Sequence, residues 1–474
     1  MKEQPRLPSA RRLGGRRIGV ALLALASLPA VTHAAAPQNC RQGPLGMPSL
    51  DDLAGRDWLG VEGGLYPGGT NRCPEEHLKA GRKLAKSLVP LAADGTPDPA
   101  GLLAFAAIGF SFTNQVFDTF MDLAADDPEF EPSVQLVNAT WRARDLEDLR
   151  DPANDYWTTL LPQQLAAAGV TAEQIQVVWV MEGARDQPAD FPDHVDLLAD
   201  DWSALITNLR ANLPNVQLAF LSPVHWQGYA WFAPHAEPYY FEQGFAVREV
   251  IARQLAGAPE LAYDPAGGAA PAPWLAWGPY FWTDGDARRS DGLSLACTDD
   301  NWDGAHLSDS GRAKLAARLL HFVKGHRACA PWSIVAGSSP AERLADTELL
   351  GGESAGALGV PRLVGGALPT VPYDDVFMLF ADHAAANGSG IVVLSERLLP
   401  AGGVPVGDGM LLVEPSLFVP IYFGSKGLGS LPMGEIPLDE SLLDLTVYAQ
   451  LAVFDASAAG GVALSQAIEF ILGD

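Results

Sequence analysis

From about residue 100 onward, strand-like apolar runs alternate with segments whose apolar side chains recur at helical spacing. The strand candidates are residues 101–110, 133–139, 175–181, 215–223 and 275–281. The helical candidates between and after them are residues 114–127, 143–150, 155–168, 194–213 and 237–257. Because apolar strands that alternate with amphipathic helices are typical of a parallel sheet covered on both faces, this pattern predicts an α/β fold.

The pattern changes after about residue 335. A segment rich in Gly, Ser and Ala, residues 336–366, leads into short apolar runs separated by turn residues. These runs are residues 374–382, 390–399, 409–424, 444–455 and 463–472. Short strands without intervening helices are typical of a β-sandwich. We therefore predict an α/β domain over residues 36–332 and a C-terminal all-β sandwich domain over residues 333–474.

The N-terminus has the pattern of a secretory signal peptide. A basic start is followed by an apolar run from Ile18 to Leu28 and by small residues at Ala34–Ala36. We expect residues 1–35 to be removed and the mature protein to be secreted or periplasmic. No later apolar run is long enough to cross a bilayer, so an integral membrane protein is not expected.

The charge balance narrows the class of partner. The whole chain carries a formal charge of −26, and removal of the signal leaves 25 basic and 56 acidic residues, a charge of −31. Such an acidic surface repels nucleic acid and anionic lipid, so neither is an expected partner.

Four cysteines remain after the signal. An even number of cysteines in an exported protein predicts two disulfides, for which three pairings are possible. Proximity in sequence favours Cys40 with Cys73 and Cys297 with Cys329.

A helix with Leu315, Leu319 and Phe322 on one face follows Ser308 and Ser310, either of which suits its N-cap. The loop just before it contains Asp303 and His306. Taken alone, such a loop is either a polar helix cap or part of a catalytic site.

Ser111 strengthens the catalytic interpretation. It lies in the turn between the first predicted strand and its helix, where free N–H groups, including that of Phe112, favour a developing negative charge. A serine nucleophile needs an adjacent base, and the base needs a carboxylate that orients it. His306 can supply the base, and Asp303, three residues before it, can supply the carboxylate. The structural alternative for Ser111 is an ordinary N-cap.

Over roughly residues 55–327 the sequence resembles the SGNH/GDSL-type serine hydrolases. The segment GFSFTN (109–114) stands at the place of the nucleophile motif, and DGAHLSDSG (303–311) stands at the place of the DxxH motif. This resemblance implies a flavodoxin-like, three-layer α/β fold and serine ester hydrolysis through an acyl-enzyme. It implies that Ser111 is the nucleophile, His306 the general base and acid, and Asp303 the orienting carboxylate.

The blocks that supply the family's oxyanion donors differ here. The second block normally contributes a glycine, but this chain has Ala139 and Thr140 and no glycine nearby. The third block normally contributes an asparagine, and Arg185 stands at or beside its position. Arg185 is either a charged replacement donor or a structural partner of Asp186 or Glu182. With Phe112, these residues are the candidate substrate or oxyanion contacts.

Two functions follow from these observations. The first is a secreted serine esterase acting on a small-molecule or carbohydrate ester; the alternative is a catalytically degenerate SGNH-fold binding or surface protein. The aromatic loop with Trp226, Tyr229, Trp231 and Phe232 is either a sugar-stacking platform or a packed loop. The sequence contains no phosphate loop, CxxC or HExxH, so we expect neither a cofactor nor a metal.

Overall fold

The computed structural model describes residues 40–230, 237–264, 270–336, 346–366, 369, 373–436 and 442–473. The predicted signal peptide lies outside the described residues, as do Trp231 and Phe232 of the aromatic loop. Within these ranges, no helix combines the length and the apolar character that crossing a membrane requires.

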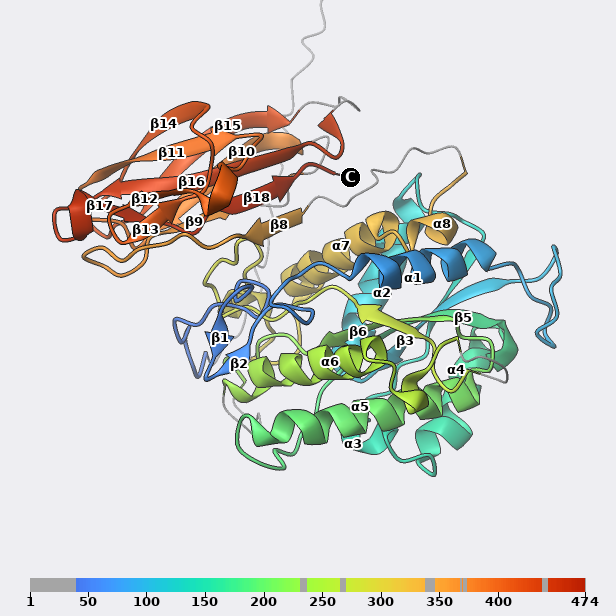
Figure 1. Cartoon of the computed structure of the whole chain (residues 1–474). Coiled ribbons are helices and arrows are strands. Elements are labelled where there is room, and N and C mark those ends of the chain that lie inside the picture. Colours follow the sequence, from blue (N-terminus) through green and yellow to red (C-terminus); the bar gives the residue numbers. More distant parts are fainter. Residues whose placement is uncertain are drawn as a thin grey trace, which may run out of the picture. The chain divides into compact units, whose positions relative to one another are not determined.

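A five-stranded parallel sheet forms the centre of the α/β part, as the alternating pattern predicts (Figure 1). Its strands lie in the order β4-β3-β5-β6-β7, so the second strand of the sheet in sequence lies at one edge beside the first. The strand order is thus 2-1-3-4-5, and ligands of open parallel sheets of this kind bind beyond the carboxyl ends of the strands. The strands are β3 (Leu103–Gly109), β4 (Val134–Asn138), β5 (Ile175–Glu182), β6 (Leu218–Pro223) and β7 (Trp274–Trp277).

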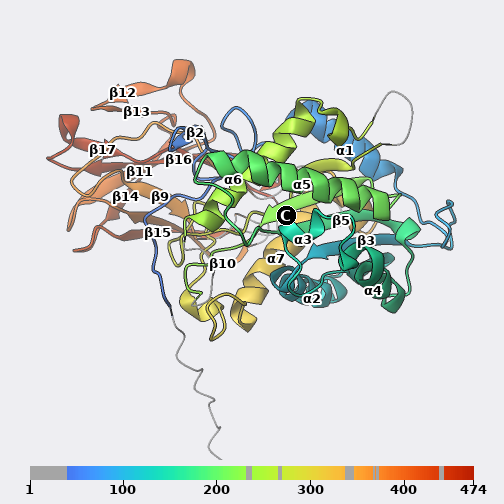
Figure 2. The same ribbon diagram turned by 90° about the horizontal axis from the view of Figure 1, so that it is seen from below.

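Helices cover both faces of this sheet. Figure 1 shows α1, α2 and α7 on one side of the strands and α5 and α6 on the other, and Figure 2 views the second group from below. The long helices are α1 (Glu75–Ser87), α2 (Ser111–Asp126), α5 (Asp193–Asn212), α6 (Tyr239–Leu255) and α7 (Asp309–Gly325). Shorter elements are β1 (Asp57–Trp58), β2 (Val61–Glu62), α3 (Leu146–Leu149), a π-helical turn (Tyr156–Leu160), α4 (Leu161–Ala167) and α8 (Ala330–Ser333).

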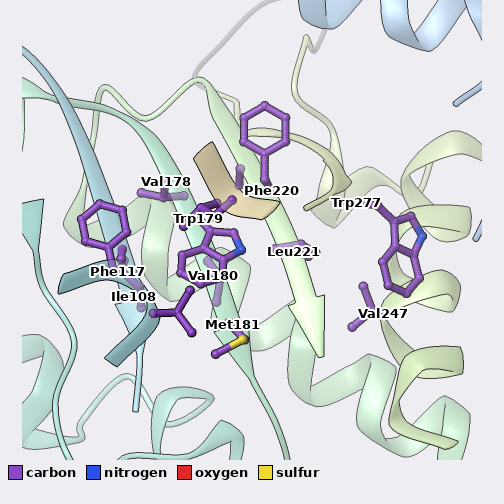
Figure 3. Close-up of a cluster of buried hydrophobic side chains, with 14 of the residues drawn as sticks. Ile108, Phe117, Val178, Trp179, Val180, Met181, Phe220, Leu221, Val247 and Trp277 are labelled. Atoms are coloured by element: carbon purple, nitrogen blue, oxygen red, sulfur yellow. The ribbon is translucent and has the colours of Figure 1, made fainter. Parts of the chain in front are cut away.

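The central strand β5 is buried along its whole length, and Figure 3 shows the apolar cluster around it. Trp179 is fully buried, stacks on Phe117 of α2 with ring centroids 6.2 Å apart, and donates its indole N–H to Ser222 Oγ at 3.0 Å. Burial of one such large apolar side chain contributes about 1.5–3 kcal/mol to folding. This core fixes the carboxyl ends of β3 and β5, where the site lies.

The remaining described strands are antiparallel and form separate sheets. One sheet has the order β15-β10-β9, a second has β14-β11-β16-β18-β8 with β17 beside β16, and β12 pairs with β13. Apolar side chains from both larger sheets share one core that includes Leu379, Val392, Leu451 and Phe470. The strands are β8 (Asp346–Leu349), β9 (Arg362–Gly365), β10 (Tyr373–Asp382), β11 (Ser389–Ser395), β12 (Val404–Val406), β13 (Gly409–Leu411), β14 (Leu417–Tyr422), β15 (Gly429–Ile436), β16 (Thr446–Phe454), β17 (Val462–Leu464) and β18 (Ile468–Ile471).

The disulfide pairing expected from proximity in sequence is wrong. Cys40 is bonded to Cys297, with Cα atoms 5.9 Å apart, whereas Cys73 and Cys329 are free thiols. The reason is a long-range contact, because the carboxylate of Asp284 accepts hydrogen bonds from the backbone N–H groups of residues 45–47. This anchor brings the start of the described chain back toward residue 297.

Candidate active site

Ser111 is the first residue of α2 and follows the tight turn at the carboxyl end of β3. Gly109 makes this turn possible because its φ of +147° lies in a region that L side chains rarely adopt. A Cβ atom at Gly109 would overlap the carbonyl oxygen of Met181 and the hydroxyl of Thr113. The strand therefore leads directly into the helix and places Ser111 at the carboxyl end of β3.

The N-terminus of α2 has no side-chain cap. Phe110 occupies the N-cap position, and its carbonyl oxygen accepts the first helical hydrogen bond from Asn114 N–H at 3.0 Å. Among the described residues, no acceptor takes the N–H groups of Ser111 or Phe112. These amides, with the positive end of the helix dipole, form a place for negative charge beside the serine hydroxyl.

The structure brings Ser111, His306 and Asp303 together. Ser111 Oγ lies 2.9 Å from His306 Nε2, and His306 Nδ1 lies 2.7 Å from Asp303 Oδ2. The second carboxylate oxygen of Asp303 accepts the backbone N–H groups of His306 at 3.0 Å and Ala305 at 3.1 Å. Burial alone would raise the pKa of Asp303, but these hydrogen bonds outweigh it and lower the pKa. Asp303 is therefore ionised and holds the histidine with its Nε2 toward the serine.

The loop that carries Asp303 and His306 is fixed at both ends. Gly304 has a φ of +69° and packs so closely on Tyr229 that a Cβ atom would overlap the carbonyl oxygen of Tyr229. Ser308 is the N-cap of α7, as one of the two sequence alternatives proposed, and its Oγ also donates to Thr298 O at 2.8 Å.

Gln115 joins the two halves of the site, a role that the sequence pattern did not reveal. Its Oε1 accepts Leu307 N–H at 3.0 Å, and its Nε2 donates to Leu307 O at 3.3 Å. Gln115 lies one turn after Ser111, and Leu307 directly follows His306. This pair of hydrogen bonds therefore ties the serine helix to the histidine loop.

Three of the candidate oxyanion residues have partners elsewhere. The N–H of Ala139 donates to Ala107 O at 3.0 Å, and the N–H of Thr140 donates to Asn138 Oδ1 at 3.3 Å. Arg185 donates its Nε to Asp145 Oδ2 at 2.8 Å and also pairs with that oxygen through Nη2. The structure thus gives Arg185 an ion pair with Asp145, not with the partners named from the sequence.

The carboxylate of Asp145 engages Arg185, which the sequence offered as a charged oxyanion donor, for a local reason. Asp145 is the N-cap of α3 and is buried, so its charge needs a partner, and Arg185 supplies it. Glu147 of α3 accepts the backbone N–H groups of Arg185 and Asp186 at 3.2 and 2.8 Å. The loop after β5 is therefore fastened to α3.

The aromatic residues near the site have different surroundings. Trp226 and Tyr229 are buried, and the ring of Trp226 packs on Trp282 with centroids 5.7 Å apart, so these two residues form a packed loop. Phe112 instead contacts the site, because its ring centroid lies 4.9 Å from that of His306.

Comparisons with known proteins give no family for this chain. No family model and no curated protein matches the sequence. Among solved structures, the chain is similar to a β-glucosidase from Listeria innocua in complex with glucose, with 12% sequence identity and a TM-score of 0.17. The match covers 82% of this chain but 47% of the β-glucosidase chain, which is about half of that protein's length. A likeness at this TM-score carries no argument about fold or activity.

Proposed function

We propose that this chain is a serine ester hydrolase of the SGNH/GDSL type that acts through an acyl-enzyme. The observation that carries the proposal is the hydrogen-bonded series Ser111–His306–Asp303, with distances of 2.9 and 2.7 Å. It lies at the carboxyl ends of a parallel sheet, where ligands of such folds bind. The chemistry needs a nucleophile, a base and an orienting carboxylate within reach of one another, and this series meets that requirement.

Acylation begins when Ser111 Oγ attacks the ester carbonyl carbon. His306 Nε2 takes the hydroxyl proton, and the Asp303 carboxylate stabilises the resulting imidazolium through Nδ1. The carbonyl oxygen becomes an oxyanion beside the uncapped N-terminus of α2, where the Ser111 and Phe112 amides donate to it. The intermediate then collapses, the C–O bond to the alcohol breaks, and His306 returns its proton to the departing alcohol.

Deacylation repeats these steps with water. His306 removes a proton from a water molecule as the water oxygen attacks the acyl carbon of the Ser111 ester. Collapse of the second tetrahedral intermediate breaks the bond to Ser111 Oγ, which regains the proton from His306. The products are the free acid and the alcohol, and the protein returns to its starting state.

The compartment and the substrate class follow from features outside the triad. The Cys40–Cys297 disulfide suits an oxidising compartment, which agrees with export through the predicted signal peptide. The proposed substrate is a carboxylic ester found in that compartment. The aromatic loop suggested a carbohydrate ester as a narrower substrate class. Because Trp226 and Tyr229 are buried, these two residues offer no surface on which a sugar ring could stack.

A second function is favoured by the oxyanion region. The Ala139 and Thr140 amides and the Arg185 side chain are engaged within the chain, so fewer donors face the serine than the family pattern supplies. Loss of one oxyanion donor typically lowers the rate about 10²–10³-fold. The alternative proposal is therefore a binding or surface protein that kept the fold without efficient turnover.

Labelling with a fluorophosphonate probe tests the proposed function, since the probe reacts with an activated serine without knowledge of the substrate. We expect wild type to be labelled, and Ser111→Ala and His306→Ala to remain unlabelled. Wild type should likewise release acetate from simple esters, and the two variants should not. Folded wild type that takes no label and releases no acetate would overturn the esterase proposal and favour the binding protein.

A further inference from the structure

A second imidazole lies directly behind the proposed triad. His225, in the loop after β6, is fully buried, and its Nε2 lies 3.1 Å from the carbonyl oxygen of Ala305. A carbonyl oxygen only accepts hydrogen bonds, so this contact needs the tautomer of His225 that carries its proton on Nε2. Gln227 Nε2, also a donor, lies 3.3 Å from the same nitrogen and would pair with the other tautomer, but that tautomer would bury an N–H on Nδ1 without an acceptor among the described residues, so the proton belongs on Nε2. Ala305 directly precedes His306, so the hydrogen bond ends on the loop that carries the proposed base.

His225 also touches the half of the site that carries the nucleophile. Phe112 follows Ser111 in sequence, and its ring makes T-shaped contacts with two imidazoles, with ring centroids 5.1 Å from His225 and 4.9 Å from His306. His225 therefore contacts both the histidine loop, through Ala305, and the serine helix, through Phe112.

The surroundings keep this second imidazole neutral. Burial lowers the pKa of His225 to about 4; the hydrogen bond to Ala305 opposes the shift, and His306 adds to it. A neutral His225 adds no positive charge beside His306 when His306 takes the proton from Ser111.

The other ring nitrogen of His225 lowers the stability of the folded state. Nδ1 is buried and has no hydrogen-bond partner within the described part of the chain. An unsatisfied buried polar group destabilises the folded state, and an apolar side chain of similar size would avoid that loss. An imidazole, unlike such an apolar side chain, can donate its Nε2–H to the carbonyl oxygen of Ala305.

We propose that His225 is a positioning residue that holds the Ala305 carbonyl and so keeps His306 within hydrogen-bond reach of Ser111. This inference rests on the proposed function, because it assigns His225 to the same proton transfer. Gln115 holds Leu307, the residue after the loop 303–306, and His225 holds Ala305 within that loop. Misplacement of a reacting group by about 1 Å can cost about 100-fold in rate.

Two variants of His225 separate positioning from packing. His225→Leu fills similar space but has no donor for the Ala305 carbonyl. His225→Gln keeps an amide N–H2 near the place of Nε2. A matched control is His77→Leu, because His77 is also buried and its Nε2 contacts a backbone carbonyl, that of Leu275, at 2.8 Å.

The measurements are the second-order rate constant for fluorophosphonate labelling, kcat and KM with p-nitrophenyl acetate, and the thermal midpoint of each variant. We expect His225→Leu to lower the labelling rate and kcat about 10- to 100-fold with KM nearly unchanged. His225→Gln should restore most of that rate. His77→Leu should lower the thermal midpoint and keep the wild-type labelling rate.

A proton NMR signal gives a readout that does not depend on turnover. The Nδ1 proton of His306, hydrogen-bonded to Asp303, should resonate far downfield in wild type and in His225→Gln, and should shift or broaden in His225→Leu. If wild type is labelled and His225→Leu is labelled equally fast, the inference about His225 is wrong and the proposed function stands. If wild type takes no label, the proposed function fails, and an unchanged His306 resonance in His225→Leu would overturn the positioning role as well.

Discussion

Gln115 shows how much of the proposed site depends on single side chains outside the triad. Ser111 and His306 lie 195 residues apart in sequence, yet their side chains are hydrogen-bonded. The amide of Gln115 accepts from and donates to the backbone of Leu307, so one side chain links α2 to the histidine loop.

Gln115→Ala should therefore slow the reaction of Ser111 strongly and lower the free energy of unfolding only modestly. The change removes two hydrogen bonds, each with a net worth of about 0.5–1.5 kcal/mol, but it also frees the loop that positions His306. We expect the rate of fluorophosphonate labelling to fall about 10-fold or more, with a folded protein by circular dichroism. Gln135→Ala is the control, because Gln135 donates one hydrogen bond to Leu136 O at 3.2 Å. Equal labelling rates of wild type and Gln115→Ala would show that the two hydrogen bonds between Gln115 and Leu307 do not position His306.

At this scale the sequence singled out residues whose local setting is distinctive, while their catalytic roles stay a prediction. Asp303 and His306 are three positions apart, so their pairing follows from chain geometry, and Ser111 follows from its place between a strand and a helix. The position of His225 after the fourth predicted strand already placed it near the site, but the contacts of Gln115 and His225 escaped prediction because their partners, Leu307 and Ala305, are distant in sequence. A polar residue on a helix face or in a loop carries no mark of such a partner.

Among the structural elements, the turn between β3 and α2 determines where the serine lies. Gly109 is the last residue of β3, and a side chain there would meet the carbonyl oxygen of Met181 and the hydroxyl of Thr113. The Thr113 hydroxyl donates to that same carbonyl oxygen and so joins α2 to β5. The strand and the helix can meet at this angle only while this position lacks a Cβ atom.

Gly109→Ala should destabilise the fold and displace Ser111. Gly169 provides the control, since it also has a positive φ, +73°, but an added Cβ atom would meet nothing within 4 Å. Gly169→Ala should cost about 1–2 kcal/mol through backbone strain alone. We expect urea unfolding to show a clearly larger loss for Gly109→Ala, together with slower labelling of Ser111. Equal unfolding free energies for the two variants would contradict the steric argument.

The elements themselves were predicted well where periodicity was long and unbroken. Residues 175–181 form β5 (Ile175–Glu182), and residues 194–213 form α5 (Asp193–Asn212). The strand β15 (Gly429–Ile436) was missed because Pro432 and its glycines argue against a strand. The structure places β15 at the edge of its sheet, where a proline is tolerated because no ladder partner needs its N–H on the outer side.

The whole molecule shows why the cysteine pairing could not be predicted. Cys40 and Cys297 are 257 residues apart and meet because the segment after Cys40 is anchored on Asp284. Neighbouring cysteines are the natural choice from sequence, but the order of strands and the return of the chain decide which thiols meet. The α/β class and the antiparallel C-terminal sheets needed only local patterns, and these were predicted.

Buried carboxyl groups make the stability of the whole molecule depend on pH. Burial raises the pKa of Glu237 from 4.5 to about 7, against three hydrogen bonds that favour its charged form. In the unfolded chain this group ionises near its ordinary pKa, so between pH 4.5 and 7 the folded state binds a proton that the unfolded state has lost. The contribution of Glu237 to stability is therefore complete below pH 4.5 and is lost as the pH rises through 7. The upper limit of this loss is about 3 kcal/mol, since one pKa unit corresponds to about 1.4 kcal/mol.

Glu237→Gln should remove this part of the pH dependence, because an amide of the same shape does not ionise. The difference in unfolding free energy between the variant and wild type should shift in favour of the variant as the pH rises from 5 to 8, by up to about 3 kcal/mol. Urea unfolding at several pH values measures this shift, and Glu260→Gln at an exposed position serves as the control. A constant difference across that range would mean that Glu237 is already ionised in the folded protein at pH 5. The carboxylate would then be held by its contacts with Gln227 N–H, Phe241 N–H and the Trp282 indole, which would have outweighed the cost of burial.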